Sequence, residues 1–402
     1  MGAENLIGRR FEDYGHGIRK ETMNVFIETV QKYSGGYLSY LKGLLSSNAV
    51  PHYVRVFVNC SSKMAEDIGK VDGNVQIIID DSPKSSVIST RKFQKERLPR
   101  LIKDHKIDLI FNSSSTMDFL HLTKIPIVTM CLNVHPFCPK EVKRYRYGKF
   151  RVKLEILKWV MIKSFERADG VIFHSQYAQH LISQYAFTKK NVVIPTGIRE
   201  EYYQTPRKVC FNRESPVNLL YVSSVFLYKH QWHVIAGVEK LRNLTGRDIR
   251  LRLLGDGEPQ AMRKLRKSLE SIGNPYYIEY LDDLPVPYKK LTAEYKNCDI
   301  FVFASSCENL PNNLLEGMAA GIPIACSNSL PMPDILKDGA EYFNPENPDS
   351  IAEALNRLID NPLVAFEKAK RAYELSNEFT WKSCIKSTFS FFHDVLDERE
   401  AK

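Results

Sequence analysis

Short apolar runs alternate with amphipathic stretches along almost the whole chain, and this alternation restricts the fold more than any other feature of the sequence. The run at 299–304 is short and nearly all apolar, as expected for a buried strand of a parallel sheet. The predicted strands are 24–30, 54–58, 75–79, 107–111, 125–130, 170–174, 191–195, 217–222, 249–254, 277–281, 299–304 and 323–326. Strands that alternate with helices in this way predict an α/β fold with mostly parallel sheets covered by helices.

The chain divides into two comparable strand-helix series. A chain of 402 residues is too long for one typical core, and the irregular stretch 196–216 separates the two series. The last stretch, 379–396, has a helical apolar face and no strand after it. The predicted organisation is an N-terminal extension at 1–22, a first domain at 23–198, a linker at 199–216, a second domain at 217–378 and a C-terminal helix at 379–402.

The stretch from Ser305 to Ser327 is the strongest candidate for a functional site. It follows the predicted strand 299–304 and leads into a helix with Pro311 in its first turn, a position that suits proline. Glu308 lies on the loop, and Glu316 lies about a turn and a half into the helix. A helix start offers unpaired N–H groups and a positive dipole end, which suit a phosphate or a sugar oxygen.

Other candidate residues also follow predicted strands, where ligands bind in parallel sheets. Lys229 follows the first strand of the second domain, on the same side as Glu308. His135 lies just past the strand 125–130. The pair Gly35-Gly36 comes between the first strand and its helix, where glycine allows backbone to approach a ligand. Each of these features is weak alone, because a surface lysine, a loop histidine or a plain tight turn would look the same.

The eight cysteines are scattered, with no C-x-x-C and no paired Cys/His spacing. This argues against a zinc site or a disulfide scaffold and favours reduced, mostly buried thiols. Cys307, beside Glu308, could be taken for a nucleophile, but no nearby His would activate it. We therefore expect Cys307 to be a packing residue.

Most of the formal net charge of +9 comes from one stretch, 140–167, which holds ten basic and three acidic residues. Aromatic residues are interleaved with the basic ones, and the second half has a strong apolar component. Such a stretch suits anionic lipid headgroups, nucleic acid, or a solvated face over a core helix. We favour an anionic membrane surface and expect no nucleic-acid partner. The residues predicted to form this membrane or acceptor face are Arg144, Arg146, Lys149, Arg151, Lys153 and Trp159.

Together these motifs resemble the retaining GT-B glycosyltransferases often called family 4. The most specific element is the pair Glu308 and Glu316, spaced as Glu-x7-Glu and followed by Gly317 to Pro323. The supporting elements are the Lys229 segment, the turn Gly255-Asp256-Gly257, Gly35-Gly36, residues 194–197 and residues 379–381. The resemblance covers the chain from about residue 23 to the last helix. It implies two Rossmann-like domains that face each other across a cleft, with a C-terminal helix that crosses back.

The resemblance also implies roles for the candidate residues. Glu316 would hold the ribose of a nucleotide-sugar, Glu308 and the N–H groups of Asn309 and Leu310 would face the sugar, and Lys229 would stabilise the leaving diphosphate. His135 would contact the transferred sugar. The further donor-binding positions are Ser224, Gly35 and Gly36. No metal or other cofactor is expected, and the main contribution of the protein would be electrostatic stabilisation of the diphosphate.

The phosphate-binding turn departs from the family pattern at two positions. Where the family commonly has a Gly and an Arg at the phosphate-binding turn, this chain has Ser223 and Ser224. One partner for the phosphate charge is therefore missing, and Arg199 or Lys289 could replace it.

These observations predict an enzyme that transfers a sugar, with retention, from a nucleotide-sugar to a cell-surface polysaccharide or a lipid-linked acceptor. The start of the chain lacks the apolar segment of a secretory signal, so we expect a cytoplasmic protein on the inner face of the plasma membrane. One alternative is a non-catalytic GT-B-like scaffold that binds a nucleotide-sugar, which the two serines would favour. Another is a two-domain sugar-nucleotide epimerase, in which the basic face would have no role.

Overall fold

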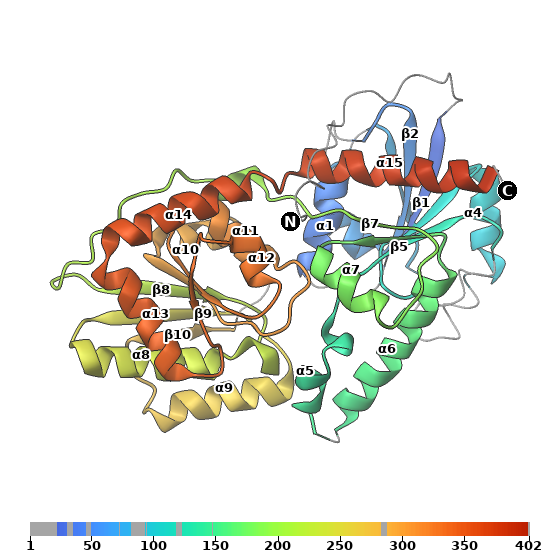
Figure 1. Ribbon diagram of the computed structural model, residues 1–402. Coiled ribbons are helices and arrows are strands. Elements are labelled where there is room, and N and C mark those ends of the chain that lie inside the picture. Colours follow the sequence, from blue (N-terminus) through green and yellow to red (C-terminus); the bar gives the residue numbers. More distant parts are fainter. Residues whose placement is uncertain are drawn as a thin grey trace, which may run out of the picture.

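The computed structural model describes residues 22–29, 35–45, 50–71, 73–81, 93, 95–117, 123–146, 148–282 and 288–400. These residues form two α/β domains that lie side by side, with the long C-terminal helix across the first domain (Figure 1). Each domain contains one parallel sheet, and helices cover its faces. The fold class predicted from the alternating pattern is confirmed.

The sheet of the N-terminal domain has seven described strands in the order β3-β2-β1-β4-β5-β6-β7, all parallel. Their bounds are β1 Met23–Glu28, β2 Val54–Cys60, β3 Val75–Ile79, β4 Leu109–Asn112, β5 Ile127–Met130, β6 Gly170–Phe173 and β7 Asn191–Val193. The strand β1 lies between β2 and β4, so the order of the strands changes direction there. In an open parallel sheet this is where the following loops separate and leave room for a ligand.

The sheet of the C-terminal domain repeats this arrangement in the order β10-β9-β8-β11-β12-β13, again parallel. Its strands are β8 Val217–Val222, β9 Ile249–Leu254, β10 Ile278–Leu281, β11 Ile300–Phe303, β12 Ile324–Ser327 and β13 Glu341–Phe343. The edge strand β13 was not predicted, because three residues are too short to give a recognisable apolar run. The change of direction falls between β8 and β11, which precede the Lys229 and Glu308 loops.

The described helices connect these strands and extend beyond them. In the N-terminal domain they are α1 Gly35–Leu44, α2 Ser62–Ile68, α4 Leu98–Asp104, η2 His135–Phe137, α5 Pro139–Lys143, α6 Lys149–Arg167 and α7 Gln176–Ser183. Further along the chain they are η3 Glu200–Tyr202, η4 Leu227–Lys229, α8 Gln231–Thr245, α9 Pro259–Ser271, α10 Tyr288–Asn297, α11 Asn312–Ala319, α12 Met332–Leu336, α13 Pro348–Asp360, α14 Pro362–Ser376 and α15 Trp381–Glu400.

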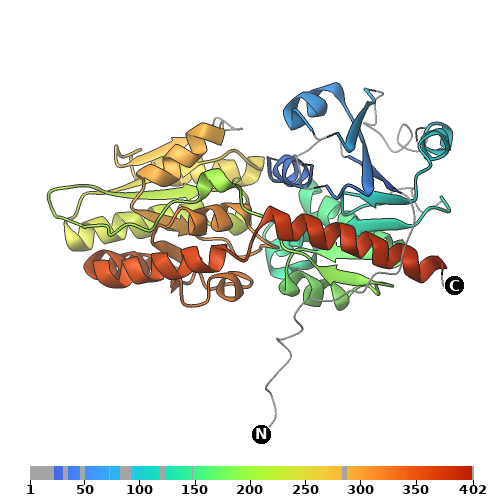
Figure 2. The same cartoon turned by 90° about the horizontal axis from the view of Figure 1, so that it is seen from above.

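The last helix, α15, belongs to the core of the N-terminal domain although it follows the C-terminal domain in the chain. Its residues Ile385, Phe389 and Phe392 are buried in one hydrophobic cluster with β1, β2 and β4. The ring centroid of Phe392 is 5.1 Å from that of Phe111 on β4. Seen from above, α15 runs along the N-terminal domain toward its far end (Figure 2). The predicted crossing of the C-terminal helix is therefore confirmed.

The two connections between the domains touch each other. Ile198, on the first connection, forms a parallel bridge with Thr380 on the second. A Cβ atom added to Gly197 would lie 2.2 Å from the backbone nitrogen of Trp381. Because such a contact is far inside van der Waals distance, only glycine fits at position 197 without moving the second connection.

The segment around α5 and the start of α6 packs on the other domain. Val142, Tyr145 and Leu154 are buried in the hydrophobic cluster of the C-terminal domain. The hydroxyl of Tyr145 accepts a 3.4 Å hydrogen bond from the backbone N–H of Leu227. The apolar residues within the basic stretch therefore hold the domains together, a long-range contact that the local pattern did not indicate.

Candidate active site

Lys229 and Glu308 meet at the point where the C-terminal sheet changes direction. Lys229 ends η4, which follows β8, and Glu308 lies on the loop after β11. Their side chains form an ion pair and are 10% and 13% exposed. The rings of Tyr228 and Phe303 lie 5.4 and 5.2 Å from the Lys229 ammonium. The protein thus holds a largely desolvated positive charge beyond the carboxyl ends of the strands, where ligands bind in such sheets.

The loop after Glu308 joins the two domains and leads into α11. The side chain of Asn309 donates a 2.7 Å hydrogen bond to the carbonyl of Cys131, and its amide oxygen accepts a 3.1 Å hydrogen bond from Ser175. The backbone N–H groups of Glu308, Asn309 and Leu310 donate no hydrogen bond within the described part of the protein. Near a helix start, such free N–H groups can bind an anion or a sugar oxygen.

Glu316 lies inside the first two turns of α11, against tyrosines that were not predicted. The hydroxyl of Tyr295 donates a 3.2 Å hydrogen bond to the Glu316 carboxyl, and Tyr202 packs on Tyr295 with ring centroids 5.6 Å apart. Burial raises the pKa of Glu316 to about 8, although hydrogen bonds from the two tyrosines and the charge of Arg199 act in the opposite direction. A carboxyl group held this way can accept hydrogen bonds from two neighbouring hydroxyls.

His135 comes from the N-terminal domain and lies in an aromatic environment at the contact between the domains. Its ring centroid is 4.7 Å from that of Tyr228, which precedes Lys229, and 5.7 Å from that of Tyr145. Its Nε2 atom is buried and has no hydrogen-bond partner among the residues that the structure describes. Burial lowers the pKa of His135 to about 4. At neutral pH the ring is therefore uncharged, with one nitrogen available to a ligand hydroxyl.

The turn Gly255-Asp256-Gly257 packs directly on the loop that carries Ser223 and Ser224. A Cβ atom added to Gly257 would lie 2.0 Å from the carbonyl oxygen of Val225, which forms a bridge with Gly257. Gly255 has a φ of 145°, which side-chain-bearing residues rarely adopt. These glycines therefore let two loops beyond the strand ends lie in contact.

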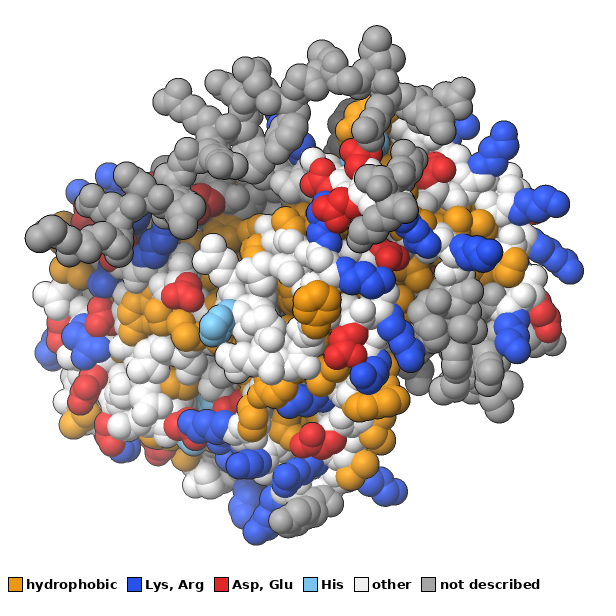
Figure 3. Space-filling view, turned by 45° about the vertical axis from the view of Figure 1, so that its right-hand side comes forward, with side chains coloured by type: hydrophobic (Ala, Val, Ile, Leu, Met, Phe, Trp, Pro, Cys, Tyr) orange, Lys and Arg blue, Asp and Glu red, His pale blue; other side chains and the backbone are white. Residues whose placement is uncertain are grey.

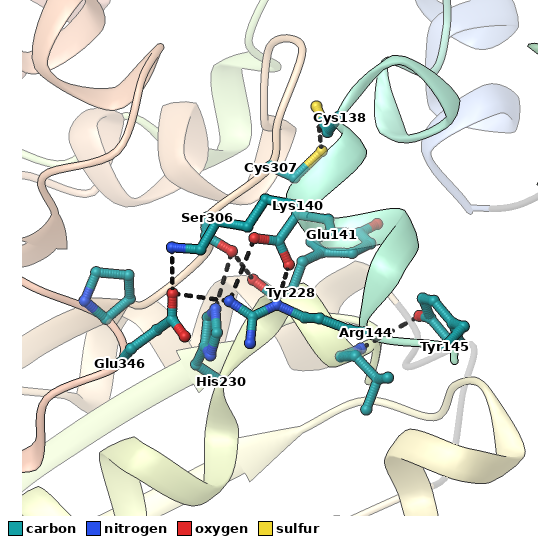
Figure 4. Close-up of polar contacts among 12 residues, drawn as sticks. Cys138, Lys140, Glu141, Arg144, Tyr145, Tyr228, His230, Ser306, Cys307 and Glu346 are labelled. Atoms are coloured by element: carbon teal, nitrogen blue, oxygen red, sulfur yellow. Dashed lines mark hydrogen bonds and ion pairs between the residues drawn. The ribbon is translucent and has the colours of Figure 1, made fainter. Parts of the chain in front are cut away.

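A polar cluster joins the domains next to this site (Figure 4). Glu346 forms ion pairs with Arg144 at 2.7 Å and with Lys140 at 2.6 Å. Arg144 also forms an ion pair with Glu141 at 2.5 Å. Burial opposes the ionisation of Glu346, but these hydrogen bonds and charges lower its pKa to about 2. Arg144 therefore does not lie on an outer face, because its side chain is 22% exposed and its guanidinium is bound to the C-terminal domain.

The cluster continues to the loop that precedes Glu308. His230 adopts a left-handed conformation with a φ of 54°, and its Nε2 lies 2.8 Å from the hydroxyl of Ser306. Burial, and then the charge of Arg144, lower the pKa of His230 to about 3. The N–H of Ser306 also donates a 2.9 Å hydrogen bond to the carbonyl of Tyr228. These contacts fix the loops of Lys229 and Glu308 relative to each other.

The remaining basic residues lie outside this cluster. Arg146, Lys149 and Lys153 are exposed, and Arg151 is half-buried with a 3.2 Å hydrogen bond to the Arg146 carbonyl. Trp159 is 63% exposed. Figure 3 shows Lys and Arg side chains gathered at the lower end of one face, with hydrophobic side chains among them. Figure 1 places the turn between α5 and α6 at that end.

The other predicted donor-binding positions differ in their burial and in the elements on which they lie. Ser223 is buried and donates a 2.9 Å hydrogen bond to the carbonyl of Ser224, whose own side chain is exposed. Gly35 and Gly36 are the first residues of α1 rather than a turn before it. Arg199 is close enough to Glu316 to influence its pKa, whereas the side chain of Lys289 lies outside the described part of the protein.

A cavity of about 330 Å³ lies elsewhere in the described part of the protein. It is lined by residues such as Asn218, Arg250 and Asn297, which lie at or before the amino ends of their strands. Lys229 and Glu308 lie beyond the carboxyl ends of the same sheet. This cavity is therefore not the candidate site.

The described helices include none that combines the length and the apolar character needed to cross a membrane.

Two family models match adjacent parts of the chain. The model described as Glycosyltransferase Family 4 matches residues 48–202, and the model described as Glycosyl transferases group 1 matches residues 205–378. The boundary between the matches falls in the predicted linker, and Lys229, Glu308 and Glu316 lie in the second range.

The chain is also similar to curated proteins. It is 28% identical over 155 residues to an exopolysaccharide phosphotransferase of Streptomyces coelicolor, a match that covers 38% of this chain and 16% of that protein. It is 22% identical over 335 residues to the amylovoran biosynthesis glycosyltransferase AmsD of Erwinia amylovora, covering 81% of this chain and 86% of AmsD. The chain thus spans less than a fifth of the first relative and most of the second.

Solved structures share the fold at low sequence identity. A sucrose-phosphate synthase of Thermosynechococcus elongatus superposes with a TM-score of 0.75 and 15% identity, covering 94% of this chain and all of that chain. HepE of Anabaena, in complex with UDP-glucose, superposes with a TM-score of 0.70 and 15% identity, covering 92% of this chain and all of HepE. With the matches to both family models, these findings show that the chain belongs to the GT-B glycosyltransferases of family 4, the group described as glycosyl transferases group 1.

Proposed function

We propose that the protein transfers a sugar from a nucleotide-sugar to a polysaccharide or lipid-linked acceptor with retention of the anomeric configuration. The observation that carries this proposal is the ion pair of Lys229 and Glu308 beyond the ends of β8 and β11, facing His135 of the other domain. The Lys229 ammonium is largely desolvated, and the N–H groups of Asn309 and Leu310 beside it donate no hydrogen bond within the described residues. This combination suits a substrate that has a diphosphate next to a sugar.

Each residue contributes a different interaction to the proposed transfer. The ammonium of Lys229 stabilises the negative charge that grows on the diphosphate as the sugar-phosphate bond breaks. The N–H groups of Asn309 and Leu310, with the Glu308 carboxylate, orient the sugar, and Glu316 accepts hydrogen bonds from the ribose hydroxyls. The neutral ring of His135 bonds to a sugar hydroxyl from the acceptor side. Since Lys229, His135 and Asn309 are at most 8% exposed, substrates enter when the domains separate.

UDP-glucose is the first donor to test, because HepE, which has the same fold, was solved with it. The acceptor classes come from relatives whose names refer to amylovoran and to lipopolysaccharide. The matched regions of these relatives cover 86% and 47% of their own lengths.

The donor proposal is tested with Lys229→Met, Glu308→Gln and Glu316→Gln, each compared with the wild type. UDP binding is followed by calorimetry, and UDP release is followed in the presence of lipid and glycan acceptors. We expect Glu316→Gln to weaken UDP binding and the other two to reduce transfer by at least about a hundredfold. The matched control is Glu353→Gln, because Glu353 is 70% exposed on α13.

Three results would change the assignment. Full transfer activity in Lys229→Met or in Glu308→Gln would contradict the proposed site. UDP binding without transfer across a panel of donors and acceptors would favour the non-catalytic scaffold instead. Sugar product formed without any added acceptor would favour an epimerase.

We also propose that the exposed side of α6 binds an anionic membrane surface, which would bring the site near lipid-linked acceptors. Val152, Ile156 and Trp159 are 57%, 58% and 63% exposed and follow one another at helical spacing. Exposed lysines at 149 and 153 adjoin this apolar stripe. Apolar side chains that enter the headgroup region, flanked by basic ones, are typical of helices that lie on a membrane.

The membrane proposal is tested by co-sedimentation with vesicles of phosphatidylglycerol and phosphatidylcholine in equal parts. We expect Trp159→Glu and Ile156→Glu to reduce binding, and added salt to weaken the binding of the wild type because it screens surface charge. The matched control is Leu363→Glu, because Leu363 is 71% exposed on α14 of the other domain. Equal binding by all four proteins would exclude α6 as the membrane contact.

A further inference from the structure

Two cysteines from different domains lie in contact beside the candidate site. The Sγ atoms of Cys138 and Cys307 are 3.1 Å apart, although the residues are 169 positions apart in the chain. Cys138 joins η2 to α5, three residues after His135, and Cys307 immediately precedes Glu308. Figure 4 shows the two sulfur atoms directed toward each other across the contact between the domains.

The surroundings of the two thiols differ in a way that favours reaction between them. Cys138 is partly exposed, whereas Cys307 is 3% exposed. The hydrogen bond with Cys307 lowers the pKa of Cys138, and a hydrogen bond with Tyr177 assists it, although burial acts in the opposite direction. The hydrogen bond with Cys138 and burial raise the pKa of Cys307. Cys138 is therefore both the more accessible thiol and the more easily ionised one, as an attacking sulfur should be.

We propose that Cys138 and Cys307 form a reversible disulfide when the protein meets a peroxide, and that this bond locks the two domains together over the site. The Sγ atoms must approach each other by only about 1 Å to reach the 2.05 Å bond length of a disulfide. Because the residues of the site are buried where the domains meet, a covalent bond at this contact prevents the separation that substrate entry requires.

The chemistry balances with hydrogen peroxide as the oxidant. The Cys138 thiolate attacks one peroxide oxygen and breaks the O–O bond, which gives a sulfenic acid and, after proton uptake, one water molecule. The sulfur of Cys307 then attacks the Cys138 sulfur and displaces the hydroxyl as a second water molecule. Two thiols are oxidised to one disulfide and one peroxide is reduced to water. A dithiol reductant reverses the bond by thiol–disulfide exchange.

The bond itself is tested on the full chain, without any assay of activity. The reduced protein is treated with hydrogen peroxide, and its thiols are counted before and after treatment. Peptide mapping then identifies the linked cysteines. We expect the loss of two of the eight thiols, a single linked pair of peptides containing Cys138 and Cys307, and full recovery with dithiothreitol. A linkage between other cysteines, or no linkage, would overturn the proposal even if no variant can be purified.

The effect on the site is tested by UDP binding, and this part rests on the proposed function. We expect oxidised wild type to bind UDP at least tenfold more weakly than reduced wild type. Cys138→Ser and Cys307→Ser should keep their affinity after the same treatment. The matched control is Cys210→Ser, which removes an exposed cysteine outside the pair and should respond as the wild type does.

The two parts of the test fail separately. If the reduced protein binds no nucleotide, the proposed function is wrong while the mapped disulfide still stands. If the disulfide forms but UDP affinity does not change, the bond does not lock the site. If oxidation weakens binding equally in Cys138→Ser and Cys307→Ser, another residue is responsible and the proposal is overturned.

Discussion

Glu316 gives a quantitative test of the site, because its raised pKa makes the free energy of unfolding depend on pH. Burial raises this pKa to about 8 in the folded state, whereas an unfolded chain has a glutamate pKa near 4.3. The stability associated with the neutral carboxyl is complete below the unfolded pKa. It is lost as the pH rises toward 8, because the unfolded chain releases the proton while the folded protein keeps it.

Replacing this carboxyl by a neutral amide removes the titration and keeps the size of the side chain. We expect wild type and Glu316→Gln to differ little in their pH dependence below about pH 4.5. Between pH 5 and pH 8 the wild type should lose stability relative to the variant by up to about 1.4 kcal/mol per pH unit. The total loss of stability between pH 5 and pH 8 is on the order of 2–4 kcal/mol. This loss corresponds to a decrease of roughly 5–15 °C in melting temperature for a domain of this size.

The assay is the difference in melting temperature between the two proteins at one-unit steps from pH 5 to pH 9. Taking the difference cancels the titration of all other groups. Glu353→Gln, on an exposed side chain, is the control and should follow the wild type at every pH. If the difference between wild type and Glu316→Gln stays constant across this range, Glu316 is not held in the neutral form and the argument from burial is wrong.

Three other changes should have effects that the structure makes specific. Lys229→Met should lower the melting temperature more than Glu308→Gln does, because it leaves the largely buried Glu308 carboxylate without any partner among the described residues, at a cost of about 3 kcal/mol, whereas a glutamine amide oxygen can still accept a hydrogen bond from the Lys229 ammonium. Thermal unfolding of both variants checks this order. Burial lowers the pKa of His135 to about 4. As the pH falls from 6.5 toward 4, the wild type should therefore lose stability relative to His135→Phe. Parallel pH profiles of melting temperature for the two proteins would contradict this. Phe392→Ala should destabilise the N-terminal domain by about 3–5 kcal/mol, because its ring is fully buried against β4. In denaturant unfolding, Phe187→Ala, at a side chain that is 76% exposed, should stay within about 0.5 kcal/mol of the wild type.

Much of the fold could be predicted from the sequence because it depends on local patterns. Continuous apolar runs identified the long buried strands, and the run at 299–304 placed Glu308 on a loop at a strand end. The strand β13 has only three residues, too few for a pattern. Gly35 and Gly36 were expected in a turn but begin α1, because a glycine pair does not by itself fix a helix boundary.

The contacts between the domains could not be predicted, because they join residues far apart in the chain. The basic stretch suggested an outward face for Arg144, yet Arg144 pairs with Glu346 of the other domain. Tyr145 was one of several aromatics among basic residues, and nothing local indicated its burial in the other domain. The tyrosines around Glu316 were missed for the same reason. Ser223 and Ser224 remain a departure from the family pattern.

The bridge between Ile198 and Thr380 limits how the two domains can move. Two independent connections would let one domain twist and slide against the other. Because the connections here are held together at a glycine contact, we expect them to act as a single hinge. Cys138 and Cys307 lie in contact between the domains, so any rotation that separates the domains there lengthens the distance between their sulfur atoms. A pair of spin labels or fluorophores on the two domains would follow that one coordinate in solution.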